Sequence, residues 1–189
     1  MTEKDHISPY LEPLAALQRL IDRFNARGVI MGGIAVTLLA RPRLTNDLDA
    51  MILLSNADIP QLFDAAKNED LLPRITDAVN FAQKHRIVLL RHEASGTNID
   101  ISLGILPFEE EVIQRSMVYP VAGLSLRLPS PEDLIILKAV AHRSKDLLDI
   151  QEIIDQHPDV DRGRIRSWVK QFAEALEMPE VWEDIAGYL

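Results

Sequence analysis

The sequence predicts a mixed α/β (α+β) fold, in which helices flank a mixed sheet formed by residues 1–128 and residues 129–189 add a C-terminal helical bundle packed on this core. Three observations indicate this division. Short apolar runs alternate with amphipathic helical segments in the first part. The segment Leu128-Pro129-Ser130-Pro131 interrupts that pattern, and helical spacing follows it. A hydrophobic content of 47% is enough for a packed core, so the chain is expected to fold on its own.

The first elements are predicted as a helix, a strand, a second helix and a second strand. Residues 14–24 keep helical spacing of their apolar positions, with Pro13 in the first turn. Val29-Ile30-Met31 is a short apolar strand, and Gly32-Gly33 turns the chain into a helix over residues 34–39. Residues 44–54 form an extended run whose second half is continuously apolar. It is predicted as a central strand buried on both faces.

The remaining elements follow from the same periodicities. Residues 59–66 outline a short helix that ends at a loop around Leu72-Pro73. Residues 86–93 and 98–104 are predicted as two strands of a hairpin, joined by a turn over residues 94–97. Another strand is expected at residues 124–128. After Pro131, helices are expected over the apolar positions of the following segments: 134–141, 147–154, 165–176 and the residues near Val181.

The composition excludes several classes of protein. The 20 basic and 29 acidic residues give a net charge of −9, which argues against a broad basic surface for nucleic acid. The absence of cysteine excludes disulfides, thiolate metal sites and cysteine nucleophiles. Residues 1–9 are polar, and no apolar run approaches the ~20 residues that a bilayer requires. A cytoplasmic protein without a membrane partner is therefore expected.

Three aspartates stand out because of their places in predicted strands. Asp47 and Asp49 are two residues apart, so their side chains share one face of a strand. Asp100 lies in an alternating apolar strand, and it adds a third carboxylate if the two strands are neighbours. Like charges held together require a cation, and oxygen ligands favour Mg²⁺ or Mn²⁺. Gly32-Gly33, between a strand and a helix, offers free amides to the phosphates that such a metal accompanies.

In this order and spacing the residues resemble the nucleotidyltransferase superfamily of the DNA polymerase β type. Its signature is Gly-Gly or Gly-Ser at the end of a strand, then a helix and turn, then Asp-x-Asp, with a third acid on a later strand. Residues 130–138 and 143–149 further resemble the S-x-E-D-L-x-x-x-K and R-x-K-D-x-x-D segments of the group that includes AbiEii-type toxins of toxin–antitoxin systems. The resemblance extends from about Arg27 to about Asp155, which is most of the chain.

The resemblance implies a nucleotidyltransferase fold and a metal-dependent transfer of a nucleoside monophosphate from an NTP to an acceptor hydroxyl, with release of pyrophosphate. Asp47 and Asp49 would hold the metal that accompanies the triphosphate, and Asp100 would join them at a second metal or take the proton of the acceptor. The implied nucleotide-binding residues are Gly32, Gly33, Lys138, Arg143, Lys145 and Asp146. Lys138 would counter the charge of the β and γ phosphates. Asp146 would either orient Lys138 or act as a base.

Alternative interpretations remain open at this point. Asp47 and Asp49 would fit a solvated strand entrance, and Lys138 would fit a side chain that lies along an apolar helix with its ammonium in water. A phosphoaspartyl phosphatase is disfavoured, because its acids follow an apolar strand, whereas here the apolar run follows Asp49. The same fold also supports a catalytically silent nucleotide- or partner-binding module, such as one component of a toxin–antitoxin pair. For an active enzyme, a small molecule or a protein is favoured over RNA as the acceptor, because the chain is acidic.

Overall fold

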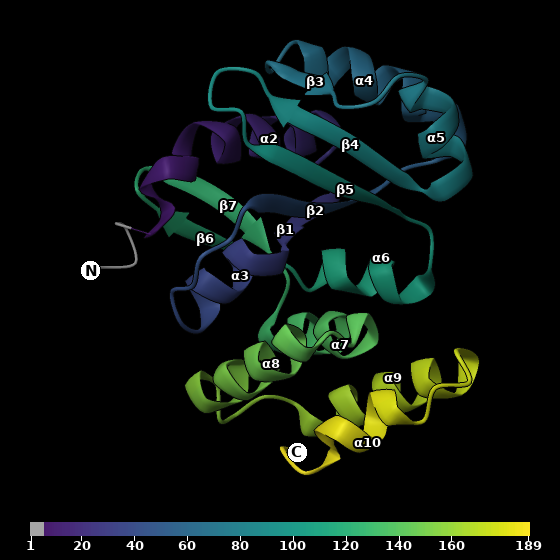
Figure 1. Ribbon diagram of the computed structural model, residues 1–189. Helices are drawn as coiled ribbons and strands as arrows, with labels where there is room; N and C mark the ends of the chain where they lie inside the picture. Colours follow the sequence, from purple (N-terminus) through teal and green to yellow (C-terminus); the bar gives the residue numbers. More distant parts are fainter. Residues whose placement is uncertain (1–5) are drawn as a thin grey trace.

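A five-stranded mixed sheet forms the centre of the molecule in the computed structural model, which describes residues 6–189 (Figure 1). Residues 1–5 of the polar start lie outside the described part. The strands are, in chain order, β1 (Gly28–Met31), β2 (Asp47–Leu53), β3 (Leu71–Pro73), β4 (Ile87–His92) and β5 (Asn98–Gly104). Their order in the sheet is β1-β2-β5-β4-β3. Only the β2–β5 pair of this sheet is parallel, and the other neighbours are antiparallel.

The sheet is amphipathic over part of its width. Leu48, Ile99 and Val88 are fully buried, whereas the alternate positions at the start of β2 and β5 are half-buried. One face is therefore closed by packing and the other remains partly open. The flanking helices are α2 (Leu11–Arg23), α3 (Gly32–Leu39), α4 (Ile59–Lys67), α5 (Ala78–His85) and α6 (Pro107–Gln114). A second, antiparallel sheet of β6 (Met117–Val121) and β7 (Leu124–Leu128) lies beside β1.

The C-terminal segment is helical, as predicted. It forms α7 (Pro131–Ala141), α8 (Ser144–Gln156), α9 (Arg162–Ala175) and α10 (Glu180–Ala186), which lie together below the sheet in Figure 1. Ser130 caps α7, because its hydroxyl accepts a hydrogen bond from the amide of Asp133 at 3.2 Å. The helices contact the core at several points: for example, α3 packs on α8, and Phe108 of α6 contacts Trp168 of α9. The domain boundary at residues 128 and 129 stays a prediction.

The expected fold class is confirmed. One local prediction is wrong, and some elements were not predicted. The expected loop at Leu72-Pro73 is strand β3, helix α5 was not predicted, and β6 was missed although its partner β7 was expected. Each missed strand contains a proline, which argues against a strand in the sequence. Proline is nevertheless tolerated at a sheet edge, where no backbone donor is needed. Within the described residues, no helix is long and apolar enough to cross a membrane.

Candidate active site

The parallel pairing of β2 and β5 brings the three predicted aspartates to one face of the sheet. In the register of the two strands, Asp49 lies opposite Asp100, and Asp47 lies opposite Asn98. Asp47 and Asp49 share a face because they are two residues apart, and directly paired residues of neighbouring strands also share a face. The conditional prediction that Asp100 joins the pair is therefore met by the topology.

The environment of Asp49 and Asp100 disfavours the charged forms of these two carboxylates. The pKa of Asp49 is raised from its ordinary value of 3.8, first by burial and then by the charges of Asp47 and Asp100. Burial also raises the pKa of Asp100, and the charge of Asp47 adds to the effect while Arg74 opposes it. Neutralising these groups with a cation would remove the repulsion, so the cluster is suited to binding one.

Arg74 lies at the candidate site and was not predicted there from the sequence. Its guanidinium forms an ion pair with the carboxylate of Asp100, and its backbone amide donates to the carbonyl of Leu89 at 3.0 Å. It follows the edge strand β3, which was itself not predicted, so no sequence signal placed it near Asp100. With the side chains in this arrangement, the described residues contain no group of three or more His, Asp or Glu positioned to hold a metal ion.

The glycine turn packs directly against the acids. Gly32 adopts φ +64°, and a Cβ added there would overlap the carboxylate of Asp49 and lie 2.7 Å from its Cβ. A Cβ on Gly33 would lie 2.6 Å from the hydroxyl of Thr45. Glycine is therefore required at both positions for the start of α3 to approach the strand that carries the acids. The predicted anion-binding turn and the predicted carboxylate cluster are in contact.

A second cluster of charges lies between α7 and α8. The ammonium of Lys138 donates to Asp146 at 2.8 Å and to Asp149 at 2.7 Å, and its side chain is only 4% exposed. Arg143 donates to Asp146 at 2.6 Å, and Arg43 contacts Asp149 at 3.0 Å. Burial acts to raise the pKa of Asp146, but the hydrogen bonds from Arg143 and Lys138 outweigh it, so the pKa is lowered.

Only some of the predicted nucleotide-binding residues belong to this second cluster. Lys138, Arg143 and Asp146 come together, while Lys145 is exposed on the first turn of α8. Asp149 and Arg43 complete the group without having been singled out for it, although Asp149 is the last acid of the R-x-K-D-x-x-D segment. A small cavity of about 110 Å³ separates the two clusters, and its wall includes Gly32, Asp49, Lys138 and Arg143.

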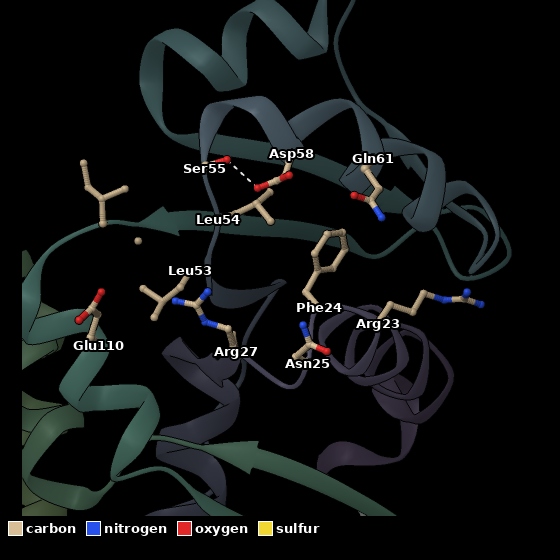
Figure 2. A pocket seen from close by; sticks show the side chains of 12 residues that line it. Arg23, Phe24, Asn25, Arg27, Leu53, Leu54, Ser55, Asp58, Gln61 and Glu110 are labelled. Atoms are coloured by element: carbon tan, nitrogen blue, oxygen red, sulfur yellow. Dashed lines mark hydrogen bonds between the residues drawn. The ribbon is translucent and has the colours of Figure 1, made fainter.

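Among the larger cavities of the molecule, two lie at the sheet. One, of about 700 Å³, lies beside β3 and β4 and is bordered by Arg74. The other, of about 530 Å³, opens at the far ends of β2 and β5, where Leu53 and Gly104 lie. Figure 2 shows the second cavity, with the ring of Phe24 and the side chain of Arg27 on its wall. The candidate site lies at the opposite ends of these strands, so this cavity is separate from it.

The glycine turn, the paired acids on the next strand and the third acid on the neighbouring parallel strand define a protein of the nucleotidyltransferase class. The sequence supports this directly, since residues 11–162 match a family model described as a nucleotidyltransferase of unknown function (DUF6036). The chain belongs to this family. Membership of the nucleotidyltransferase superfamily is thereby confirmed, while the finer resemblance to AbiEii-type toxins stays a prediction.

Similar chains occur among solved structures, and the first of them shows the same fold. An antigenic nucleotidyltransferase-like protein from Paracoccidioides brasiliensis has a TM-score of 0.56 and 18% identity, over 93% of this chain and 92% of that chain. The antibiotic-resistance factor ANT(2'')-Ia in solution has a TM-score of 0.48 and 17% identity, over 99% and 92%. Its crystal structure with adenylyl-2''-tobramycin has a TM-score of 0.45 and 18% identity, over 92% of each chain. No curated protein matches the sequence.

Proposed function

We propose that the chain transfers a nucleoside monophosphate from an NTP to the hydroxyl of an acceptor, in a metal-dependent reaction that releases pyrophosphate. The observation that carries the proposal is the register of β2 and β5, which places Asp49 beside Asp100 and above Gly32. This arrangement combines carboxylates for a cation with backbone amides for phosphates, which are the two requirements for binding a nucleoside triphosphate with its metal.

The donor set fits Mg²⁺ or Mn²⁺. The three carboxylates of Asp47, Asp49 and Asp100 offer only oxygen ligands. Their mutual repulsion and the burial of Asp49 and Asp100 would be relieved by a bound cation. Asp47 and Asp49 would hold the metal, with Asp100 as a further ligand once it leaves Arg74. When bound, such a metal stabilises the negative charge that develops on the attacking and leaving oxygens.

The transfer forms one bond and breaks one. The acceptor oxygen bonds to the α-phosphorus, the bond from that phosphorus to the bridging oxygen of the β-phosphate breaks, and pyrophosphate leaves with the bonding electrons. The carboxylate of Asp100, on the face that the acceptor approaches, takes the hydroxyl proton. The amides of Gly32 and Gly33 orient the phosphates beside Asp49.

The second charge cluster provides the cations on the nucleotide side. Arg143 is the stronger candidate for contact with the phosphates, since its side chain is 58% exposed and the charges of Asp49 and Asp47 contribute to raising its pKa, after the larger effect of its hydrogen bond to Asp146. Lys138 is almost enclosed by Asp146 and Asp149, so Asp146 would orient it at the cavity wall. Lys145, exposed at the start of α8, is a further candidate.

A small molecule is the favoured acceptor. The net charge of −9 offers little to the many phosphates of a long RNA, whereas cavities of the size found beside the site suit small ligands.

A second function, that of a catalytically silent nucleotide- or partner-binding module, is favoured by the state of the three acids. Arg74 forms an ion pair with Asp100, and the carboxylates of Asp47, Asp49 and Asp100 are not positioned to hold a metal ion together in this arrangement.

An assay with nucleotides labelled at the α-phosphate separates the two functions. The protein is incubated with Mg²⁺, each labelled NTP and a cell extract, and labelled products are sought while NTP binding is measured by calorimetry. Transfer of label that is lost in Asp47→Asn supports the enzyme. The matched control is Asp64→Asn, which alters an exposed aspartate on α4. Tight NTP binding without any labelled product would instead establish the silent module.

A further inference from the structure

The three acids divide the open face of the sheet into two sides. On one side, Met31 of β1 pairs with Asp49 and leads to the glycine turn and the small cavity with Lys138 and Arg143. On the other side, Leu89 of β4 pairs with Asp100. The cavity of about 700 Å³ opens there, and its lining residues include Leu72, Arg74, Leu89, Arg91, Glu93 and Asn98. The nucleotide and a second ligand therefore have separate places on either side of the acids.

The larger cavity is a continuation of the face that carries Asp100. Arg91 pairs with Asn98, and Leu72 of β3 pairs with Arg91, so these side chains lie on the same face as Asp100. Arg74 joins the two places physically, because it lines the cavity and forms the ion pair with Asp100. A molecule in this cavity has direct access to the third acid.

Two guanidinium groups line the cavity, and that of Arg91 is the one without a carboxylate in an ion pair among the described residues. Arg91 donates from Nε to the carbonyl of Gly96 at 3.0 Å, and among the described residues no carboxylate forms a salt bridge with it. Arg74 adds a second guanidinium, whereas Glu93 at the rim supplies one carboxylate. Leu72 and Leu89 provide an apolar floor between these groups. Arg91 is exposed, and its guanidinium is suited to a phosphate or a carboxylate, which it can bind through two parallel hydrogen bonds.

We propose that this cavity binds the acceptor, and that the acceptor is a small hydroxylated molecule carrying a phosphate or carboxylate that Arg91 recognises. The inference rests on the proposed function, because it takes Asp100 as the group that receives the hydroxyl proton. Asp100 and Arg91 are diagonal neighbours on adjacent strands, roughly 7–8 Å apart at their backbones. An acceptor of about the size of one sugar ring spans this distance. A polycationic acceptor is disfavoured, since the guanidinium of Arg91 would repel it.

The first experiment identifies the acceptor and tests Arg91. A protein-free extract of small molecules is incubated with the enzyme and the labelled NTP, and the labelled product is identified by mass spectrometry. We expect an acceptor with a phosphate or carboxylate, and an increase of about tenfold in its KM in Arg91→Gln, with the KM for NTP unchanged. Arg27→Gln, at the far end of the sheet, is the matched control and leaves both values unchanged. A neutral or cationic acceptor, or an unchanged KM, overturns the proposal.

The second experiment needs no activity and separates the two proposals. Binding of glucose 6-phosphate, glucuronate, glucose and glucosamine is measured by calorimetry without nucleotide, which also shows whether phosphate or carboxylate is preferred. We expect the two anions to bind at least tenfold more tightly than glucose and glucosamine, and Arg91→Gln to remove the difference. Equal binding of all four overturns the acceptor proposal even if NTP is used. A preference for anions in a protein that fails to bind NTP would leave the anion site standing and reject the proposed transfer.

Discussion

Two clusters of aspartates face the same small cavity with opposite charge balance. On the helical side, Asp146 and Asp149 are matched by Lys138, Arg143 and Arg43. On the sheet side, Asp47, Asp49 and Asp100 have one direct cation, Arg74, which pairs with Asp100. The pKa of Asp146 is lowered, whereas the pKa values of Asp49 and Asp100 are raised. The first cluster is balanced by cations of the protein itself, whereas the second carries an excess of negative charge.

This difference suggests different roles for chemically similar residues. A buried ion pair whose partners are all present holds the fold together, and removing one partner leaves an uncompensated charge. A cluster of like charges lowers stability, and such a cost is typical of a functional site. The following changes test this contrast in order of decreasing effect.

The largest effect is expected for Asp49→Asn. Loss of the central carboxylate should reduce nucleotidyl transfer by roughly a thousandfold, as expected when a ligand of the metal that stabilises the developing negative charge is removed. The same change should raise the free energy of unfolding by about 1 kcal/mol at pH 7, because it relieves repulsion and the burial of a charge. Because the pKa of Asp49 is raised in the folded state, this gain should shrink as the pH falls and the wild-type carboxyl becomes protonated.

Urea unfolding at several pH values and the labelled-NTP assay check both parts, with Asp64→Asn as the control. A variant that loses both activity and stability would show that Asp49 supports the fold, which contradicts the contrast.

The opposite effect on stability is expected for Lys138→Met. Removing the ammonium leaves Asp146 and Asp149 buried with too little positive charge, so the free energy of unfolding should fall by about 3–5 kcal/mol. The pKa of Asp146 is lowered in the folded state, so the stabilisation is present above its ordinary pKa of 3.8 and is lost as the pH falls through the folded value. The difference in the free energy of unfolding between wild type and variant should therefore become smaller as the pH falls.

Lys145→Met is the matched control, because Lys145 is exposed on the neighbouring helix, and its unfolding free energy should change by less than about 0.5 kcal/mol. Equal stability of the two variants would contradict a structural role for Lys138.

A smaller effect is expected for Gly32→Ala. The new methyl group must overlap the carboxylate of Asp49 and adopt a left-handed backbone conformation, so the free energy of unfolding should fall by about 2 kcal/mol. Gly123→Ala separates the two contributions, because Gly123 has φ +85° and nothing within 4 Å of its added Cβ. That control should cost about 1 kcal/mol from the backbone alone. Equal losses, measured by thermal unfolding, would show that the contact with Asp49 has no energetic weight.

The shared face of Asp47 and Asp49 and the turn at Gly32-Gly33 could be predicted from the sequence, because local patterns specify them. Asp47 and Asp49 share a face in any strand, and Gly32-Gly33 marks a turn wherever it separates a strand from a helix. Periodicity cannot predict which strands are neighbours, so the contact between Asp49 and Asp100 was conditional on the topology. The position of Arg74 depends on the short edge strand β3, whose three residues carry no periodicity of their own.

The smallest effect is expected for Arg74→Gln, which tests whether the sheet-side cluster has spare affinity for a cation. Arg74 opposes the effects of burial and Asp47 on Asp100, so its removal should raise the pKa of Asp100 further, as measured by carbon-13 NMR titration of the carboxyl groups. The acidic limb of the activity profile should move to higher pH with it, since Asp100 must be ionised to accept a proton. Above that limb, Mn²⁺ should bind a few-fold more tightly, because the guanidinium no longer competes for the carboxylate. Arg91→Gln, which leaves the ion pair intact, should change neither the pKa of Asp100 nor the affinity for Mn²⁺. Weaker Mn²⁺ binding in Arg74→Gln would mean that Arg74 positions Asp100 for the metal and does not compete with it.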